Sequence, residues 1–378
     1  MAATNNTRVI IITMAELDII TPSLFDKLFV DDTPMIDVRS PAEFAKGAFP
    51  FTTNLPILND NERRRVGLRY KELGLEAARS LGHSLVSGRT RNVRIEAWKD
   101  FREANNNTVL YCFRGGARSR IACEWLASRG VSVPLVVGGY KAMRQHLLDV
   151  YQRLPNVLLV SGRTGSGKTT FLSNFENAID LEWLANHRGS AFGGNLSPQP
   201  TQIDFENSLA ICFLKKRSQS EILLEDEGHL IGRINLPSPL QDAMKTSPII
   251  VIEEPVKVRT KRIYHEYIVR QWQNYQDYFK LQAEVEFEKY LLSAIDAIRK
   301  RLGGLAHQQI RQQMVEACKY QKQNGCLELH LRWINALLVD YYDPMYDYQI
   351  TKKASRVLAR DSRLALLEWY NYKLSDGF

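Results

Sequence analysis

A glycine-rich segment at residues 162–169, Gly-Arg-Thr-Gly-Ser-Gly-Lys-Thr, constrains the fold of this chain more than any other feature. Residues 156–161 before it form an apolar run of the kind found in buried strands, and residues 168–174 after it have a helical pattern. A glycine-rich turn between a strand and a helix directs backbone N–H groups and the helix N-terminus at a bound anion. We therefore predict a parallel α/β sheet with a phosphate site at the end of this strand.

The spacing Gly-x4-Gly-Lys-Thr within this segment matches a full Walker A motif, the signature of a P-loop. In this motif the lysine neutralises the outer phosphates, and the hydroxyl of the following Thr or Ser ligates Mg²⁺. The motif indicates a diphosphate or longer anion without naming the substrate. The expected phosphate-binding residues are Gly162, Arg163, Thr164, Gly165, Ser166, Gly167, Lys168 and Thr169.

A second acidic ligand for Mg²⁺ is expected at the end of a neighbouring strand. Residues 221–224 form a strand-like run that ends at Glu225, Asp226 and Glu227. Asp226 is the favoured partner of Thr169 at a magnesium ion, and Glu225 is the alternative. A solvated acidic turn would show the same pattern, so that interpretation stays open.

A second anion-binding loop, Cys-Phe-Arg-Gly-Gly-Ala-Arg-Ser, occupies residues 112–119. Adjacent glycines let successive backbone N–H groups turn inward, which stabilises a thiolate or an oxyanion. The expected catalytic residues are Cys112 as the nucleophile, with Arg114, Gly115, Gly116 and Arg118 around it. The spacing suits either a rhodanese-type sulfur or selenium carrier or a Cys-x5-Arg phosphatase, and it does not separate the two.

Alternating strand-like and helix-like segments predict the domain organisation. In the first part we expect strands at residues 8–12, 35–38, 109–112 and 133–137, with helices at 119–129 and 140–154. In the second part we expect further strands at 208–213, 221–224 and 249–252. Beyond residue 256 the pattern is helical throughout, without clear strands. The predicted domains are residues 1–150, 151–258 and 259–378.

A dense positive cluster lies at residues 257–270, directly after Pro255. Arg259, Lys261 and Arg262 are expected either to contact an RNA backbone or to point back at the phosphate loop, as lid arginines do in kinases. A solvated helix face is the plain alternative.

Bulk properties limit the functional classes. The net charge of +8 favours a polyanionic partner without proving one. The five cysteines include no CxxC pair and no metal-ligand spacing with histidine, so neither a disulfide framework nor a zinc site is indicated. No segment resembles a signal peptide or a membrane span. We therefore expect a soluble, cytoplasmic protein with no membrane partner.

The two loops together, in this order, resemble the bacterial tRNA 2-selenouridine synthase family. Residues 37–44 (Asp-Val-Arg-Ser-Pro-Ala-Glu-Phe) and 137–140 (Val-Gly-Gly-Tyr) resemble rhodanese signatures. Further similarity to the synthase family lies in residues 187–193, 199–200, 205–207, 225–227 and 231–232. The fold class expected is α/β, with a rhodanese-like N-terminal domain, a P-loop NTPase-like parallel-sheet domain and an all-helical C-terminal region.

The resemblance implies a two-step transferase reaction on the wobble uridine of certain tRNAs. In this reaction 2-thiouridine is first S-geranylated from geranyl diphosphate, and the geranylthio group is then replaced by selenium from selenophosphate to give 2-selenouridine. Cys112 is then the selenium carrier, and Lys168 and Thr169 in the phosphate loop grip the geranyl diphosphate. No tightly bound cofactor is implied. The expected partners are tRNA carrying 2-thiouridine and an enzyme that supplies selenophosphate, with Mg²⁺ as a candidate ligand.

Two other functions are compatible with the same motifs. The first is a Cys-dependent phosphatase joined to a P-loop kinase-like domain, although Tyr111 occupies the position where many such phosphatases carry His. The second is a noncatalytic tRNA-binding sensor in which both loops serve only as anion sites. Turnover of an aryl phosphate would favour the first, and tight tRNA binding without turnover would favour the second.

Overall fold

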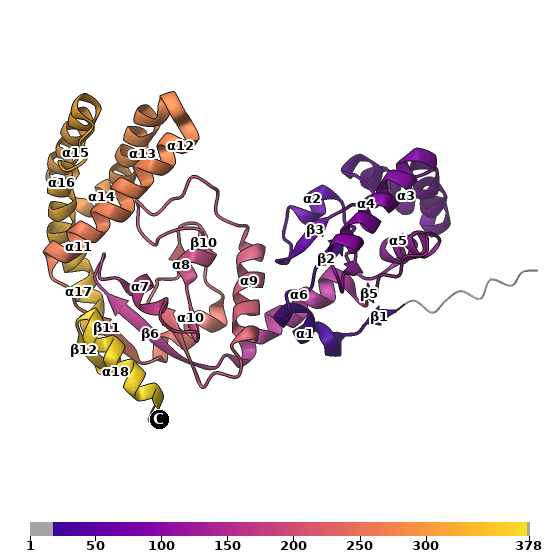
Figure 1. Cartoon of the computed structure of the whole chain (residues 1–378), viewed down its shortest axis with the longest axis horizontal. Helices are drawn as coiled ribbons and strands as arrows, with labels where there is room; N and C mark the ends of the chain where they lie inside the picture. Colours follow the sequence, from indigo (N-terminus) through magenta and orange to yellow (C-terminus); the bar gives the residue numbers. More distant parts are fainter. Residues whose placement is uncertain (1–17, 376–378) are drawn as a thin grey trace, which may run out of the picture. The chain divides into compact units, whose positions relative to one another are not determined.

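The computed structural model describes residues 18–375 and divides the chain into two compact units (Figure 1). We call them the N-terminal unit (Met1–His146) and the C-terminal unit (Leu147–Phe378), and we describe each by itself. The strand expected at residues 8–12 lies outside the described residues. None of the helices within residues 18–375 is long and apolar enough to cross a lipid bilayer.

In the described part of the N-terminal unit, five parallel strands form one sheet with the order β1-β5-β4-β2-β3. The strands are β1 (Ile19–Ile20), β2 (Met35–Asp37), β3 (Thr52–Asn54), β4 (Val109–Tyr111) and β5 (Leu135–Val136). Strands are thus confirmed within the expected ranges 35–38, 109–112 and 133–137. Every residue of β2 and β4 is buried, which is typical of central strands in a parallel sheet covered on both faces.

Helices follow or separate the strands of this unit. They are η1 (Pro22–Leu24), α1 (Phe25–Val30), α2 (Pro41–Phe44), α3 (Asp60–Leu85), α4 (Gly88–Ala104), α5 (Ala117–Ala127) and α6 (Gly139–Val150). The helix expected at residues 119–129 corresponds to α5. Helix α3 is interrupted at Gly74, whose backbone has φ 77° and ψ −170°. A core cluster beside the sheet includes Trp98, Leu110 and Cys123.

In the described part of the C-terminal unit, a second parallel sheet has the strand order β12-β11-β6-β8-β7. The strands are β6 (Asn156–Gly162), β7 (Ala178–Ile179), β8 (Glu221–Glu225), β11 (Ile249–Ile252) and β12 (Val357–Asp361). A separate antiparallel pair consists of β9 (Leu230–Ile231) and β10 (Ile234–Asn235). The strands expected at 156–161, 221–224 and 249–252 are confirmed.

The strand expected at residues 208–213 is wrong, because this segment lies in helix α9 (Gln202–Lys215). Its buried residues Phe205, Leu209 and Phe213 are four positions apart, which is the spacing of one helix face. Thr201 caps the helix by accepting a hydrogen bond from the backbone N–H of Asp204. A short apolar run such as residues 208–213 is found in buried strands and in buried helices alike. The Thr201 cap, which indicates a helix, lies outside that run.

The expected all-helical C-terminal region also needs a correction. β12 pairs in parallel with β11 and extends the sheet, so residues 259–378 belong to the same compact unit as the phosphate loop. This strand lies at the sheet edge and is partly exposed along its length. An exposed edge strand needs no continuous apolar run, and Arg360 and Asp361 within it gave no strand signal in the sequence.

Apart from β12, the region from residue 256 to the end of the described chain is helical. The helices of the C-terminal unit are η2 (Tyr151–Arg153), α7 (Lys168–Leu172), α8 (Leu181–Leu184), α9, α10 (Ser238–Thr246), α11 (Val256–Ile263), η3 (Tyr264–Val269), α12 (Arg270–Phe279), η4 (Lys280–Gln282), α13 (Ala283–Ala297), α14 (Arg299–Leu302), α15 (Gly304–Asn324), α16 (His330–Leu337), η5 (Leu338–Tyr342), α17 (Asp343–Lys352), η6 (Ala354–Arg356) and α18 (Arg363–Ser375). Figure 1 shows α12, α13, α15 and α16 gathered at one end of this unit. Their shared core includes Phe287, Met314 and Trp333.

His330 is the buried polar centre of this helical core. Its Nδ1 accepts a hydrogen bond from Trp333 Nε1 at 2.9 Å, and its Nε2 lies 3.1 Å from Gln321 Oε1. Because an indole N–H can only donate, the neutral ring carries its proton on Nε2, which donates to Gln321. Burial lowers the pKa of His330 to about 4.

We predict that the C-terminal unit loses stability as the pH falls from about 6.5 towards 4. In this window the unfolded chain binds a proton on His330, whereas the folded chain does not. Between pH 6.5 and 5 this loss amounts to ~2 kcal/mol. Urea unfolding followed by tryptophan fluorescence at both pH values should show a steeper loss for the wild type than for His330→Gln. Equal losses in the two proteins would contradict the assignment.

Candidate functional site

The phosphate loop connects β6 to α7 and opens into a cavity of about 540 Å³. The segment from Thr164 to Thr169 lines this cavity, whereas the side chain of Arg163 turns away and pairs with Asp347 at 2.7 Å. Of the predicted phosphate ligands, Arg163 can therefore contribute its backbone but not its guanidinium. The arrangement of strand, loop and helix N-terminus is that of an anion site.

Two polar atoms that line the cavity lack partners. Among the described residues, the Ser166 hydroxyl and His187 Nδ1 are buried without a hydrogen-bond partner. Burial lowers the pKa of His187, so this ring is neutral at physiological pH and one of its nitrogens is a free acceptor or donor. Buried polar groups normally find partners, and a bound phosphate would supply them here.

Lys168 sits among carboxylates at the start of α7. Burial lowers its pKa, but Tyr346, Glu227, Glu182 and Glu225 outweigh burial, so the pKa of Lys168 is raised above its ordinary value. Its Nζ also lies 5.9 Å from the centre of the Tyr346 ring. The lysine is therefore charged at physiological pH and available to neutralise a phosphate.

The carboxylates around Lys168 are more numerous than one cation can neutralise. Burial raises the pKa of Glu225 well above its ordinary value, and Glu182 and Asp180 raise it further. Burial likewise raises the pKa of Glu227 to about 7, although Lys168 acts against this rise. Such a surplus of acidic groups beside a phosphate loop suits an anion that arrives with a divalent cation.

The oxygen donors for that cation differ from the favoured expectation. The Thr169 hydroxyl donates to Glu225 Oε1 at 3.0 Å, while Asp226 accepts from Lys353 at 2.6 Å and from Ser161 at 2.8 Å. The geometry therefore favours Glu225, the alternative, over Asp226 as the carboxylate that faces Thr169. Asp226 is held by a C-terminal lysine that local sequence could not reveal. Within residues 18–375, no group of three or more His, Cys, Asp or Glu side chains is arranged to hold a metal.

The basic helix α11 reaches the phosphate loop with two of its three expected side chains. Arg259 Nη1 donates to the Thr164 carbonyl at 3.2 Å, and Arg262 Nη1 donates to the Gly165 carbonyl. Arg259 is only 1% exposed, so an RNA contact through its guanidinium is excluded in this conformation. Arg262 lines the phosphate cavity and is placed as a lid arginine, whereas Lys261 is exposed.

Helix α17 contributes partners that sequence reasoning missed. Asp343 pairs with Arg259 at 2.7 Å and Asp347 pairs with Arg163 at 2.7 Å, while Tyr346 lies over Lys168. Asp343 and Asp347 are four residues apart and so lie on one face of the helix. The spacing of Asp343 and Asp347 can be read from the sequence. No local sequence pattern connects the two residues to the phosphate loop, which lies about 180 residues earlier.

The cysteine loop lies between β4 and α5 in the N-terminal unit. Cys112 is 3% exposed, and its Sγ lies 3.2 Å from the Ser119 hydroxyl, which can donate to a thiolate. Gly115 has φ 63° and packs against Gly139, where a side chain would collide with the Cys112 carbonyl. The Gly138-Gly139 pair thus closes the loop from the start of α6.

Arginines surround the open side of this loop. Cys112, Arg114, Gly116 and Arg118 line a cavity of about 450 Å³ together with Arg63. Glu43 also lines this cavity, and its carboxylate accepts from Arg118 at 2.5 Å and 3.3 Å. Burial alone would raise the pKa of Glu43, but hydrogen bonds and charge from Arg118 dominate and lower it. The cavity is therefore built for an anion beside a thiol.

Cys123 is the nearby thiol that could have competed with Cys112 for a catalytic role. It lies in the core cluster on α5, and its Sγ contacts the Val133 carbonyl at 3.5 Å. Burial raises the pKa of Cys123 to about 12, so it stays protonated and unreactive at physiological pH. Asp37 and Arg39 form a buried ion pair at the end of β2.

Comparison with known proteins gives consistent results across the chain. Residues 155–376 match the family model described as the tRNA 2-selenouridine synthase AAA domain. A tRNA 2-selenouridine synthase from Alcanivorax borkumensis is 48% identical over 91% of this chain and 97% of that protein. Proteins with the same name from Marinobacter nauticus and Shewanella sediminis are 48% and 44% identical, over 92% and 95% of this chain and 96% and 99% of theirs.

A solved structure also aligns with part of the chain. It is the N-terminal domain of a protein described as ATP/GTP binding, from Clostridium difficile 630, with 32% identity over 35% of this chain and 99% of that chain. The TM-score of 0.32 is too low for this likeness to support a fold argument.

We predict that Arg262→Ala weakens the binding of inorganic diphosphate with Mg²⁺ about tenfold, a change of ~1.4 kcal/mol. The substitution removes a charge from the phosphate cavity, where Arg262 contacts the Gly165 carbonyl. Lys261→Ala is the matched control, since it removes the neighbouring but exposed charge. Titration calorimetry should separate the two variants, and equal weakening would show that only net charge matters.

Proposed function

Because this chain belongs to the tRNA 2-selenouridine synthase family, we propose that it replaces the sulfur of 2-thiouridine in tRNA by selenium. In the proposed reaction the wobble 2-thiouridine is first S-geranylated from geranyl diphosphate. Selenium from selenophosphate then displaces the geranylthio group to give 2-selenouridine. The chain is therefore proposed to act as a transferase on tRNA with both activities.

The order of the two steps follows from the chemistry of the leaving group. Alkylation removes the thiocarbonyl character of the sulfur and allows it to leave as a neutral thiol once it takes a proton. A selenium nucleophile can then form the new bond at C2 of the base. The exchange is redox-neutral, since selenium enters as selenide and ends as the selenocarbonyl of the base. The phosphoryl group of selenophosphate is transferred to water, which gives phosphate.

The observation that carries this proposal is the placement of Cys112 in a cavity lined by arginines. Arg114 and Arg118 can neutralise a selenophosphate anion beside the thiol, and the Ser119 hydroxyl can donate to the sulfur as thiolate. We assign to Cys112 the uptake of the selenium donor. A resolving role for Cys123 is not needed, because that thiol is buried in the core.

The phosphate loop is assigned to the first step. Lys168, with Arg262 closing over the loop, would hold the diphosphate of geranyl diphosphate and stabilise it as it leaves. Thr169 and Glu225 offer two oxygen ligands for a magnesium ion that would neutralise the same group. A buried carboxylate next to a threonine hydroxyl fits a magnesium ion. Binding of this ion at Thr169 and Glu225 is part of the proposal.

The candidate tRNA contacts on α11 are fewer than the sequence alone suggested. Arg259 is buried in an ion pair, so Lys261 and the neighbouring exposed Lys257 are the better candidates for phosphate contacts on α11. An enzyme that supplies selenophosphate is a further proposed partner.

The decisive test is nucleoside mass spectrometry of 2-thiouridine tRNA after incubation with the protein and geranyl diphosphate, with and without selenophosphate. Successive appearance of the geranylated and selenated nucleosides is expected. Turnover of an aryl phosphate without either mass shift would instead support the phosphatase and kinase alternative, and tight tRNA binding without any turnover would support a sensor.

In the same assay Cys112→Ala should reduce selenation at least a thousandfold while geranylation continues, because the thiol acts only on the selenium donor. Cys123→Ala is the control, since it removes a buried thiol from the same core cluster. Selenation at the wild-type rate in Cys112→Ala would refute the role of this cysteine.

Lys168→Ala should show the opposite pattern. Geranylation should fall at least a hundredfold, since the lysine is the cation nearest to the outer phosphates in a P-loop. Selenation of tRNA that already carries the geranyl group should be preserved. Undiminished geranylation by this variant would place the diphosphate elsewhere on the protein.

A further inference from the structure

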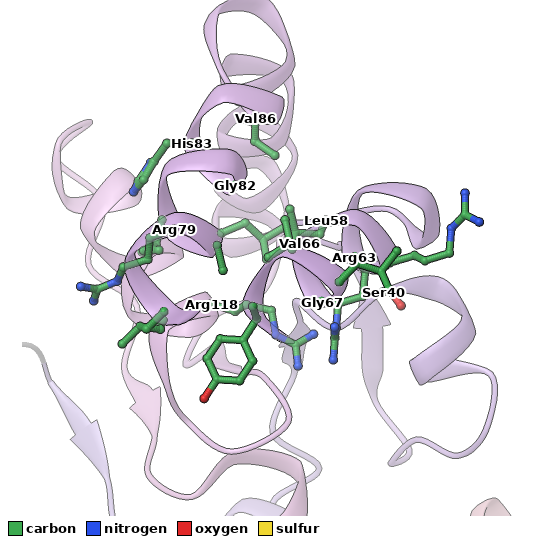
Figure 2. A pocket seen from close by; sticks show the side chains of 18 of the residues that line it. Ser40, Leu58, Arg63, Val66, Gly67, Arg79, Gly82, His83, Val86 and Arg118 are labelled. Carbon is green, nitrogen blue, oxygen red and sulfur yellow. The ribbon is translucent and has the colours of Figure 1, made fainter. Parts of the chain in front are cut away.

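A cavity of about 800 Å³ lies in the N-terminal unit between the two arms of α3 and helix α5. Figure 2 shows Leu58 and Val66 near its centre, with Arg79 at its edge pointing outward. This volume is in the range of small-molecule pockets, which usually combine an apolar wall with a few polar groups at the opening.

Helix α3 forms the cavity by turning back on itself at Gly74. The nearest atom to a side chain placed at Gly82 would be Val66 Cγ2, at 3.9 Å. In a straight helix these two positions would be about 24 Å apart. Only a reversal at Gly74, which has a positive φ, brings the two arms together.

The wall of the cavity exposes apolar side chains that a folded protein normally buries. Leu68, Tyr70 and Leu75 line it and are 51%, 57% and 53% exposed. Deeper in the wall lie Val86 and Ala78, both buried. An apolar concavity left open to solvent in this way marks a binding site for an apolar group.

This cavity adjoins the Cys112 cavity. Arg63, Ala117 and Arg118 line both of them. A ligand whose reacting atom lies at Cys112 can therefore extend an apolar group past Arg118 into the larger cavity. The arginines at the shared edge suit a ligand that is anionic or joined to a phosphate backbone.

The two pockets at the phosphate loop of the C-terminal unit do not provide a comparable apolar space. Polar and charged side chains dominate the lining of the phosphate cavity, including Asp180, Glu182, Arg188 and Glu227. The apolar pocket beside it, lined by Phe192 and Trp333, has about 20 Å³, which is room for about one water molecule.

We propose that the 800 Å³ cavity holds the geranyl chain of the S-geranyl-2-thiouridine base during selenium exchange, so that the geranylthiol leaves into an apolar site next to Cys112. This inference rests on the function proposed above and assigns the chain a site that differs from the phosphate loop. In the exchange a carbon–selenium bond forms at C2 and the carbon–sulfur bond breaks. The electron pair of the broken bond leaves on sulfur, which takes a proton from water.

Leu75→Asp tests this assignment, with Leu73→Asp as its matched control. Both leucines are more than half exposed, at 53% and 62%, and they flank Gly74, but only Leu75 lines the cavity. Because both side chains are exposed, we expect the fold to tolerate a new charge at either position, whereas only Leu75→Asp places a carboxylate against the geranyl chain. Leu75→Met keeps an apolar side chain and should retain activity.

Single-turnover rates should be measured in two arms on the full chain. The first arm follows selenation of tRNA that already carries the geranyl group, with selenophosphate. The second follows geranylation of 2-thiouridine tRNA from geranyl diphosphate. We expect Leu75→Asp to slow the first reaction at least tenfold and to leave the second within twofold, and Leu73→Asp and Leu75→Met to leave both within twofold.

The other outcomes are equally informative. Loss of geranylation alone in Leu75→Asp would assign the cavity to free geranyl diphosphate and overturn the assignment to the geranylated base. Wild-type rates in both arms would overturn the cavity as a chain site. If the wild type itself converted neither substrate, the proposed function would fail. Binding of the S-geranyl-2-thiouridine nucleoside, followed by fluorescence because Trp125 lines the cavity, would then test the cavity alone.

Discussion

The phosphate site depends on one buried ion pair between Arg259 and Asp343. Arg259 bonds both carboxylate oxygens at 2.8 Å and 2.7 Å and also donates to the carbonyls of Thr164 and Glu254. These bonds tie the phosphate loop, the end of β11 and helix α17 into one body. Removing one partner would leave an uncompensated buried charge, which typically costs about 3–5 kcal/mol. The helical C-terminal region is thus a structural part of the phosphate site.

The two anion sites differ in electrostatic character, and the difference matches the two proposed substrates. At Cys112 the cations Arg63, Arg114 and Arg118 face a single carboxylate, Glu43, so a free anion gains from binding there. Around Lys168 buried carboxylates are in excess, and burial together with their mutual repulsion raises the pKa values of Glu225 and Glu227. A diphosphate with a divalent cation suits the second site, whereas selenophosphate alone suits the first.

Sequence predicted the features that depend on local chemistry. Both loops lie between a strand and a helix because glycine spacing and flanking apolar runs are local signals. Tertiary partners could not be predicted, so an RNA contact and a contact to the phosphate loop both stayed open for Arg259, and Asp226 was preferred over Glu225. The large cavity could not be predicted either. This cavity depends on the reversal of α3 at Gly74. A single glycine within a helical pattern does not by itself predict a turn.

Glu43 fixes the position of an arginine at the cysteine site. Because Arg118 lowers the pKa of Glu43, this carboxylate stays charged at physiological pH and holds the guanidinium at the edge shared by both cavities of the N-terminal unit. Glu43 lies at the third position of α2, where its side chain also accepts from the Ser40 backbone N–H. The segment at residues 37–44 therefore positions a loop arginine through Glu43 and also forms the buried Asp37–Arg39 ion pair. An incoming anion must share Arg118 with Glu43, which favours ligands that bring a second contact, such as an apolar chain in the adjoining cavity.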